Sequence, residues 1–446
     1  MNTEHPLKNV VKLQKKGIPI GIYSVCSANE IVIQVAMEKA LSMDSYVLIE
    51  ATANQVNQYG GYTNMKPIDF RDFVYSIAKR INFPENRIIL GGDHLGPLPW
   101  KNQQAKKAME EAKELVKQFV MAGFTKIHVD TSMLLGDDNI NIKLDTETIA
   151  ERGAILVSVA ERAFEELKKF NPYALHPVYV IGSEVPVPGG SQKENNNEIQ
   201  VTKPTDFEET VEVYKSTFYK YGLGNAWEDV VAVVVQAGVE FGVEDIHEYD
   251  HQQAENLVSA LKKYPNLVFE AHSTDYQPAK LLKEMVRDGF AILKVGPELT
   301  FALREGLFAL NIIEKELFKD NHDIEMSNFI DILDTAMLNN PKYWEQYYYG
   351  DDNKIRIARK YSYSDRCRYY LIENEVRASM SRLFKNLTNV EIPLTLISQY
   401  MPIQYEKIRM GLLKNDPENL VKDKIGNCID KYLYATNPTS GEFKLI

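Results

Sequence analysis

The chain has 446 residues, of which 44% are hydrophobic and 25% are charged, so it is long enough to bury a sizeable core. Its formal net charge of -11 argues against nucleic acid or an anionic membrane as a partner, although a local basic pocket for a phosphate stays open. Three widely spaced cysteines, an N-terminus unlike a signal peptide and the absence of a long aliphatic run predict a cytoplasmic protein.

Eight short apolar segments alternate with helical segments over about the first 310 residues, as in (β/α)8 proteins. The segments that we expect to form strands are 18–25, 46–52, 87–92, 126–130, 177–182, 230–235, 267–271 and 291–295. None shows the polar alternation of a solvent-facing sheet, and polar residues follow nearly every one of them. This pattern favours a closed (β/α)8 TIM barrel over a doubly wound open sheet, which would gather its polar residues near one switch point.

The pattern changes after about residue 320 to Tyr-rich helical segments without clear strands. We therefore expect residues 1–318 to form an α/β barrel that carries the site and residues 319–446 to form a helical C-terminal extension. The extension would pack on the barrel or on a partner, and we expect the chain to form a homo-oligomer.

The stretch Gly-Gly-Asp-His-Leu-Gly-Pro at 91–97 follows the third expected strand. Its first glycines allow the backbone to approach a ligand or metal closely, and Gly96-Pro97 takes the chain out of strand geometry. Asp93 and His94 thus stand where a strand ends, which is where parallel α/β proteins carry their chemistry. An Asp-His pair is also common in solvated turns.

Three potential metal ligands, His94, Glu240 and His272, follow the third, sixth and seventh expected strands. In a closed barrel these strand ends converge, and two imidazoles with one carboxylate are a common ligand set for a divalent catalytic metal, most simply Zn²⁺. The alternative is that Glu240 and His272 are hydrogen-bonded loop residues and that His94 caps its strand.

Other polar residues on the same rim complete the predicted site. The candidate proton-transfer residues are Asp93, Asp130 and Glu184, and the expected substrate-binding residues are Glu50, Gln236, Asp275, Lys294 and Arg366. Each acid could instead cap a helix, and each cation could be a solvated or ion-paired surface residue.

Six segments carry a resemblance to the GatZ/KbaZ family, which is related to the class II fructose/tagatose-bisphosphate aldolases. They are GGDHLGP (91–97), HVDTSM (128–133), GSEVPVPGG (182–190), QAGVEFG (236–242), EAHSTD (270–275) and YSDRCRYY (363–370). Class II aldolases carry Asp-His after strand three and further His ligands after strands six and seven. Asp93, His94 and His272 match this pattern, whereas Glu240 stands where the aldolases have a His, which also makes Mn²⁺ or another harder ion an option beside Zn²⁺.

The resemblance implies a sugar or sugar phosphate of tagatose or fructose stereochemistry as substrate. The expected activity is metal-dependent retro-aldol and aldol chemistry, including C4 epimerisation, with Asp93 taking the C4 hydroxyl proton. The alternative is a non-catalytic subunit that supports the activity and stability of a separate class II aldolase. Family members also carry a tagatose-6-phosphate kinase label, but no Gly-x-x-x-x-Gly-Lys-[Ser/Thr] loop occurs in the chain.

Overall fold

The computed structural model describes residues 4–182 and 199–439. Eight parallel strands form a closed barrel, in which β1 completes the ring by pairing with β10 from Ile22–Ile292 to Val25–Val295. The barrel strands are β1 (Ile22–Val25), β2 (Val47–Thr52), β3 (Ile88–Leu95), β4 (Lys126–Val129), β5 (Val178–Ile181), β6 (Val230–Val234), β9 (Val268–Ala271) and β10 (Phe290–Val295). The predicted (β/α)8 barrel is therefore confirmed, and the doubly wound alternative is wrong because the sheet has no open edge.

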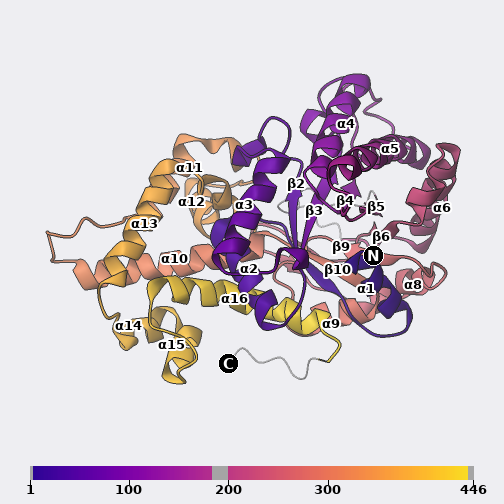
Figure 1. Cartoon of the computed structure of the whole chain (residues 1–446). Helices are drawn as coiled ribbons and strands as arrows, with labels where there is room; N and C mark the ends of the chain where they lie inside the picture. Colours follow the sequence, from indigo (N-terminus) through magenta and orange to yellow (C-terminus); the bar gives the residue numbers. More distant parts are fainter. Residues whose placement is uncertain (1–3, 183–198, 440–446) are drawn as a thin grey trace.

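Helices follow the strands and surround the barrel (Figure 1). They are α2 (Glu30–Ser42), α3 (Pro67–Arg80), α4 (Ala105–Met121), α5 (Thr146–Phe170), α6 (Pro204–Lys220), α7 (Gly224–Trp227), α8 (His251–Leu261), α9 (Ala279–Arg287) and α10 (Pro297–Phe318). Local sequence sets where several begin: Asn29 accepts hydrogen bonds from the first free N–H groups of α2, and Asp145 does so for α5.

The interior of the barrel changes from apolar to charged along its axis. At the N-terminal end of the strands, α1 (Pro6–Lys15) places Leu7 and Val11 in one apolar cluster with inward-facing strand residues such as Leu48 and Ile292. Nearer the C-terminal end the buried side chains are ionic: Glu50, Lys126, Glu270 and Lys294. One end is therefore a packed plug and the other end can carry chemistry.

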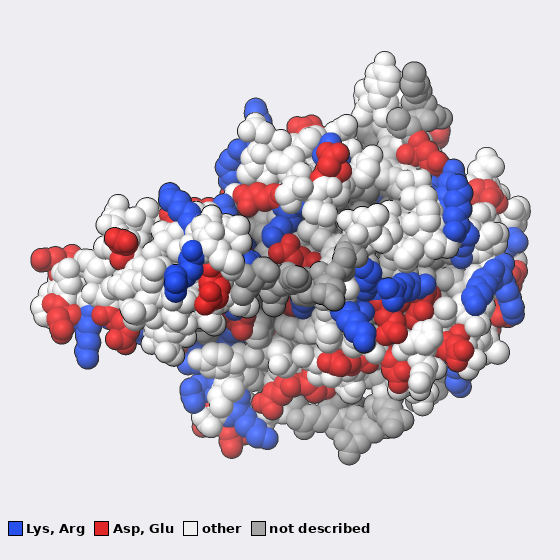
Figure 2. Space-filling view, turned by 90° about the horizontal axis from the view of Figure 1, so that it is seen from below, with Lys and Arg blue, Asp and Glu red and all other residues white. Residues whose placement is uncertain are grey.

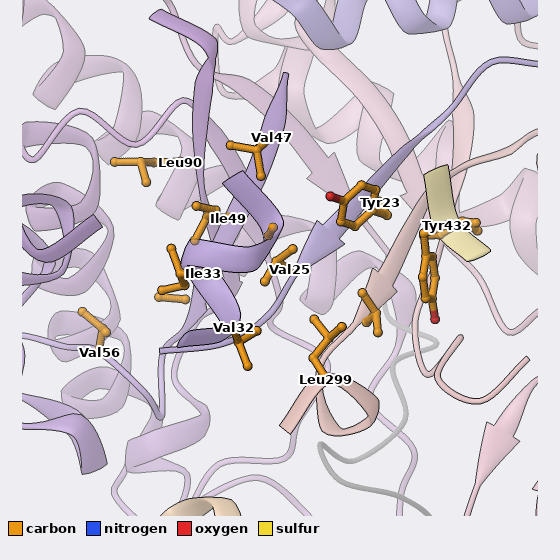
Figure 3. Close-up of a cluster of buried hydrophobic side chains, with 14 of the residues drawn as sticks. Tyr23, Val25, Val32, Ile33, Val47, Ile49, Val56, Leu90, Leu299 and Tyr432 are labelled. Atoms are coloured by element: carbon orange, nitrogen blue, oxygen red, sulfur yellow. The ribbon is translucent and has the colours of Figure 1, made fainter. Parts of the chain in front are cut away.

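The largest hydrophobic core lies between the strands and the surrounding helices. Figure 3 shows part of it, where Val25 and Ile49 of the barrel meet Val32 and Ile33 of α2. These side chains are at most 1% exposed, so the strand–helix contacts remove most of their apolar surface from water.

The predicted helical C-terminal extension is present and shares this core. It contains α11 (Phe329–Asn339), α12 (Asp352–Tyr361), α13 (Asn374–Thr388), α14 (Leu394–Tyr400), α15 (Pro402–Arg409) and α16 (Pro417–Thr436), with the 3₁₀ turns η4 (Pro341–Tyr343) and η5 (Arg366–Tyr370). Helices α11 to α15 lie at one side of the barrel, whereas α16 returns beneath it (Figure 1). Tyr432 of α16 packs on Tyr23 of β1 with ring centroids 5.9 Å apart, and the N–H of Gly21 donates to the carbonyl of Thr436.

The charged side chains of the two signs are interspersed on the face seen in Figure 2. This face shows no large basic surface of the kind that binds nucleic acid. Among the residues that the structure describes, no helix is both long enough and apolar enough to cross a bilayer.

Candidate active site

A β-bulge directs Asp93 and His94 into the mouth of the barrel. Gly92 pairs with Ile127 and Leu95 pairs with Val129, so Asp93 and His94 together stand opposite the single residue His128. His94 adopts a left-handed backbone conformation with φ of +49°, which is rare for a residue with a side chain. Bulges and such strained residues occur where side chains must be redirected, and both occur here at one pair.

Three imidazoles cluster beside this bulge. The ring centroids of His94 and His128 are 5.1 Å apart, those of His94 and His272 are 4.9 Å apart, and those of His128 and His272 are 5.4 Å apart. All three side chains are buried. The structure therefore brings together two of the predicted ligands, His94 and His272, with a third histidine that lies within strand β4.

Carboxylates contact a nitrogen of each ring, and His94 is contacted at both, because its Nε2 atom also lies 3.4 Å from Asp93. The Nδ1 atom of His94 lies 3.2 Å from Asp130, and the Nδ1 atom of His128 lies 2.9 Å from Asp93. The Nε2 atom of His272 lies 3.0 Å from Glu270. A carboxylate on one ring nitrogen fixes the orientation of an imidazole and leaves the other nitrogen available for a metal.

The donor atoms fit a divalent cation. Asp93, His128, Glu270 and His272 each offer one ligand atom within 4.8 Å of the others, whereas His94 contacts the group through its ring without belonging to it. The Nε2 atom of His128 is buried without a hydrogen-bond partner in the described structure. A buried polar atom of this kind is costly unless a ligand or ion satisfies it.

Two buried lysines belong to the same cluster. Lys126 lies 2.6 Å from Glu50 and 2.7 Å from Glu270, and Lys294 lies 3.0 Å from Asp93 and also pairs with Glu50. With Asp130, the cluster holds four carboxylates against two ammonium groups. Asp93 and Asp130 outweigh burial and raise the pKa of His94, so this ring offsets part of the surplus negative charge, and a divalent cation would offset the rest.

The environment sets the protonation of these groups. Burial lowers the pKa of His272 to about 3, so its ring is neutral at pH 7, as a metal ligand must be. Burial alone would favour the neutral form of Asp93, but His94, Lys294 and the hydrogen bond with His128 outweigh it and hold the pKa of Asp93 well below its usual range. Asp93 is therefore an ionised proton acceptor.

Glu240, the third predicted ligand, is not among the converging ligand atoms of the described residues. It begins strand β7 (Glu240–Phe241), which forms an antiparallel ribbon with β8 (Ile246–His247). Its carboxylate accepts a hydrogen bond from the N–H of Phe241, and it belongs to no group of converging ligand atoms among the described residues. The next residue, Phe241, lines the cavity, and the carboxylate of Glu240 is hydrogen-bonded to Ser273 beside His272, so Glu240 lies at the edge of the site.

The cavity at the barrel mouth includes several of the other predicted residues. Asp93, His94, His272, Asp275 and Lys294 line it. Asp130 is behind His94 and does not line the cavity, and Glu50 lies beneath it between the two lysines. The side-chain oxygen of Gln236 accepts from the N–H of Gly238 in its own loop, also away from the cavity. Glu184 lies outside the described residues.

The extension contributes to the cavity through η5, where Arg368, also a candidate from the sequence, lines the cavity and Arg366 does not. Arg366 packs on the ring of Tyr347 and donates to the carbonyl of Tyr343. Arg368 and Tyr369 instead line the cavity. The two arginines point in different directions because η5 is a tight 3₁₀ turn.

Sequence reasoning missed His128, Lys126 and Glu270 as parts of the site. The signal was present in β4, where polar residues at 126, 128 and 130 do alternate with apolar ones, contrary to our expectation that no strand shows such alternation. Because alternate residues of a barrel strand face the interior, this period of two places all three on the inside. The same alternation places Glu270 of β9 and His272, which directly follows β9, on the same side of the chain.

Comparison with known proteins gives a consistent relationship. The family model for the D-tagatose-1,6-bisphosphate aldolase subunit GatZ/KbaZ-like proteins matches residues 7–437. The D-tagatose-1,6-bisphosphate aldolase subunits GatZ of Salmonella agona and Salmonella typhimurium are each 46% identical over 432 residues, which cover 97% of this chain and 99% of the relative. A crystal structure of a probable tagatose 6 phosphate kinase from Sinorhizobium meliloti superposes with a TM-score of 0.84 at 42% identity, covering 93% of this chain and all of that one. The chain belongs to the GatZ/KbaZ-like family.

Proposed function

We propose that this chain is a metal-dependent enzyme that breaks and re-forms the C3–C4 bond of ketohexoses or their phosphates, of tagatose and fructose type. The reaction is retro-aldol and aldol chemistry and includes epimerisation at C4. The observation that carries the proposal is the cluster of three buried imidazoles beside an ionised Asp93 at the mouth of a barrel. The names of the relatives, which are subunits of a tagatose-bisphosphate aldolase, support the substrate class.

The metal ligands in this proposal are His94, His128 and His272, with Zn²⁺ as the first candidate and Mn²⁺ as the second. His128 takes the place that the sequence pattern had given to Glu240. When bound, a divalent cation supplies Lewis acidity that stabilises the negative charge of an enediolate. Asp130 and Glu270 act on this centre indirectly, because each fixes the orientation of one imidazole.

Asp93 is the proposed general base. It accepts the proton of the C4 hydroxyl as the C3–C4 bond breaks, and it returns this proton when the bond re-forms. Lys294, 3.0 Å from Asp93, keeps the carboxylate ionised and lines the cavity, where its ammonium group can donate to a substrate oxygen. If the aldehyde turns over before the bond re-forms, its other face is attacked and the C4 epimer results.

The rest of the cavity suits a polyhydroxylated ligand. Asn54 and Gln55 supply amide groups, and Arg368 supplies a guanidinium for a hydroxyl or phosphate. The aromatic rings of Tyr62 and Tyr369 also line the cavity, with their centroids 4.8 Å apart. Polar groups set among aromatic walls orient such ligands by hydrogen bonds and stacking.

The test is to assay the isolated chain, reconstituted with Zn²⁺ or Mn²⁺, on tagatose, fructose and their mono- and bisphosphates. We expect conversion between C4 epimers or cleavage to trioses, and we expect Asp93→Asn to lower the rate by about 100-fold or more while retaining the metal. A wild-type chain that binds metal but converts none of these sugars would contradict the proposal.

The relatives' description as aldolase subunits favours a second candidate function, a non-catalytic partner of a class II aldolase. In that case the isolated chain turns over no sugar, and its addition raises the activity or the thermal stability of a class II tagatose-bisphosphate aldolase. The Asp93→Asn variant separates the two functions, because a purely supporting subunit would stimulate the aldolase equally well with either residue.

A further inference from the structure

A second carboxyl group faces the cavity from the side opposite Asp93. Asp93 belongs to β3, and Asp275 follows β9. In the closed ring, three strands separate β3 from β9 on one side (β2, β1 and β10) and three on the other (β4, β5 and β6). Both side chains line the same cavity, so they approach a bound molecule from opposite walls.

The carboxyl of Asp275 is fixed rather than free to rotate. Its Oδ1 atom accepts hydrogen bonds from the backbone N–H groups of Gly296, at 2.9 Å, and Glu298, at 2.8 Å, at the start of α10. The loop that carries it has two residues with left-handed backbone, Ser273 and Tyr276. This strained loop holds a buried carboxyl, only 2% exposed, at the edge of the cavity.

The surroundings of Asp275 differ from those of Asp93. Burial, together with the nearby charge of Glu298, raises the pKa of Asp275 to about 7. The charges of Glu240 on the β7–β8 ribbon and of Lys431 on α16 also act on Asp275, as does Tyr276, and Lys431 pairs with Glu298. A pair of carboxyls whose environments favour opposite protonation states is the arrangement that assigns one residue as acid and the other as base.

We propose that Asp275 is the second proton-transfer residue of the site, which delivers a proton to C3 of the enediolate and removes it in the reverse direction. This inference rests on the proposed function. It assigns the two steps to two walls: Asp93 acts on the C4 oxygen, and Asp275 acts on C3.

The step balances without a further reactant. Asp93 takes the C4 hydroxyl proton, the C4 carbon becomes an aldehyde, and the electron pair of the broken C3–C4 bond remains on the enediolate. The O–H bond of Asp275 then breaks as a C3–H bond forms, which yields the triose ketone. Water afterwards takes the proton from Asp93 and supplies one to Asp275. Epimerisation at C4 requires no protonation of C3, so only net cleavage and its reverse depend on Asp275.

The test measures hydrogen exchange at the carbon that becomes C3. Dihydroxyacetone and its phosphate are incubated in D₂O with the metal-loaded chain, and deuterium incorporation is followed by NMR. We expect Asp275→Asn to lower the ratio of exchange rate to epimerisation rate by about 100-fold, because its amide can still accept the two N–H bonds but cannot donate a proton from an acid. Asp93→Asn should shift that ratio in the opposite direction.

Two further variants make the result specific. Glu314→Gln changes a buried carboxyl of α10 that contacts Ser327 and does not line the cavity, and it should leave the ratio near that of the wild type. If Asp275→Asn does not fold, the pair Asp275→Glu and Asp275→Gln decides, since only the first retains an acid and should exchange. A wild-type ratio in Asp275→Asn, or equal exchange by Glu and Gln, would overturn the inference while leaving the proposed function intact. A wild-type chain that neither exchanges nor converts sugars would overturn both.

Discussion

The Nδ1 atom of His128 lies 2.9 Å from Oδ1 of Asp93, which joins an imidazole in the middle of β4 to the acid that opens the bulge of β3. This contact ties the proposed general base to the proposed metal centre. Because the rings of His94 and His272 also lie close to that of His128, we propose His128, rather than Glu240, as the third metal ligand.

The ligand assignment can be tested by metal content. We expect His128→Gln to lose most of the bound Zn²⁺ or Mn²⁺, whereas Glu240→Gln retains it, because Glu240 lies in the β7–β8 ribbon outside the cluster. Elemental analysis of the purified variants measures this, with His176→Gln as a control at a histidine that contacts Glu161 away from the cavity. Loss of metal in Glu240→Gln with full occupancy in His128→Gln would reverse the assignment.

Lys126 should be essential for stability. Lys126→Met leaves the buried carboxylates of Glu50 and Glu270 without their shared cation, and breaking a buried pair in this way costs about 3–5 kcal/mol. Denaturant unfolding gives the change in the free energy of unfolding. Lys220→Met removes an exposed pair with Glu151 and should change stability little. Equal effects of the two substitutions would show that the buried network does not stabilise the fold.

Gly91 is required by the side chain of Glu50. A Cβ atom at position 91 would lie 2.6 Å from Cγ of Glu50, so Gly91→Ala forces this carboxylate and its lysine contacts to move. We expect a loss of about 1–3 kcal/mol in the free energy of unfolding, as for other overpacked cores, together with reduced turnover. Gly123→Ala is the comparison: its Cβ meets open space, and only its positive φ opposes the substitution. Unchanged activity in Gly91→Ala would mean that Glu50 tolerates displacement.

Arg368 should affect substrate affinity, whereas Arg366 should not. Arg368→Lys keeps the charge but loses the forked geometry at the cavity wall, and we expect KM to rise about 10-fold with a smaller effect on kcat. Arg366→Lys disturbs the contact with Tyr347 and should lower thermal stability while KM stays close to that of the wild type. Steady-state kinetics on the best sugar of the panel distinguishes them. A raised KM only in Arg366→Lys would restore the prediction made from sequence.

Asp275 should also make stability depend on pH. Its pKa is about 7 in the folded chain, against an ordinary value of 3.8, so between pH 4 and 7 the folded state binds more protons than the unfolded state. The free energy of unfolding therefore falls as pH rises through this window, by up to about 1.4 kcal/mol per pH unit for one group. Asp275→Asn removes this contribution. The free energy of unfolding of the wild type should therefore fall relative to that of the variant from pH 4 to 7, and the difference between the two should stay constant above pH 7. A constant difference would contradict the shifted pKa.

The sequence by itself was sufficient for the barrel, for the family and for part of the site. In the closed barrel each strand has a neighbouring strand on each side and helices on its outer face, so the strands are mostly apolar. The alternation of apolar and helical segments that results can be recognised from local sequence. Asp93, His94 and His272 could be found because they lie in the last three residues of β3 or directly after β9, where position along the chain still fixes position in space.

Only the tertiary structure decided which other side chains meet there. Glu240 stands after the correct strand, but its carboxylate is hydrogen-bonded to Phe241 and Ser273 and is not among the converging ligand atoms of the described residues. His128 and Lys126 look like strand residues in sequence, yet closure of the ring turns their alternate positions inward toward Asp93 and Glu270. Arg368, more than 270 residues from Asp93 in the sequence, reaches the same cavity because the extension folds back over the barrel mouth. Such convergence depends on closure and packing over long sequence separations, which no local pattern encodes.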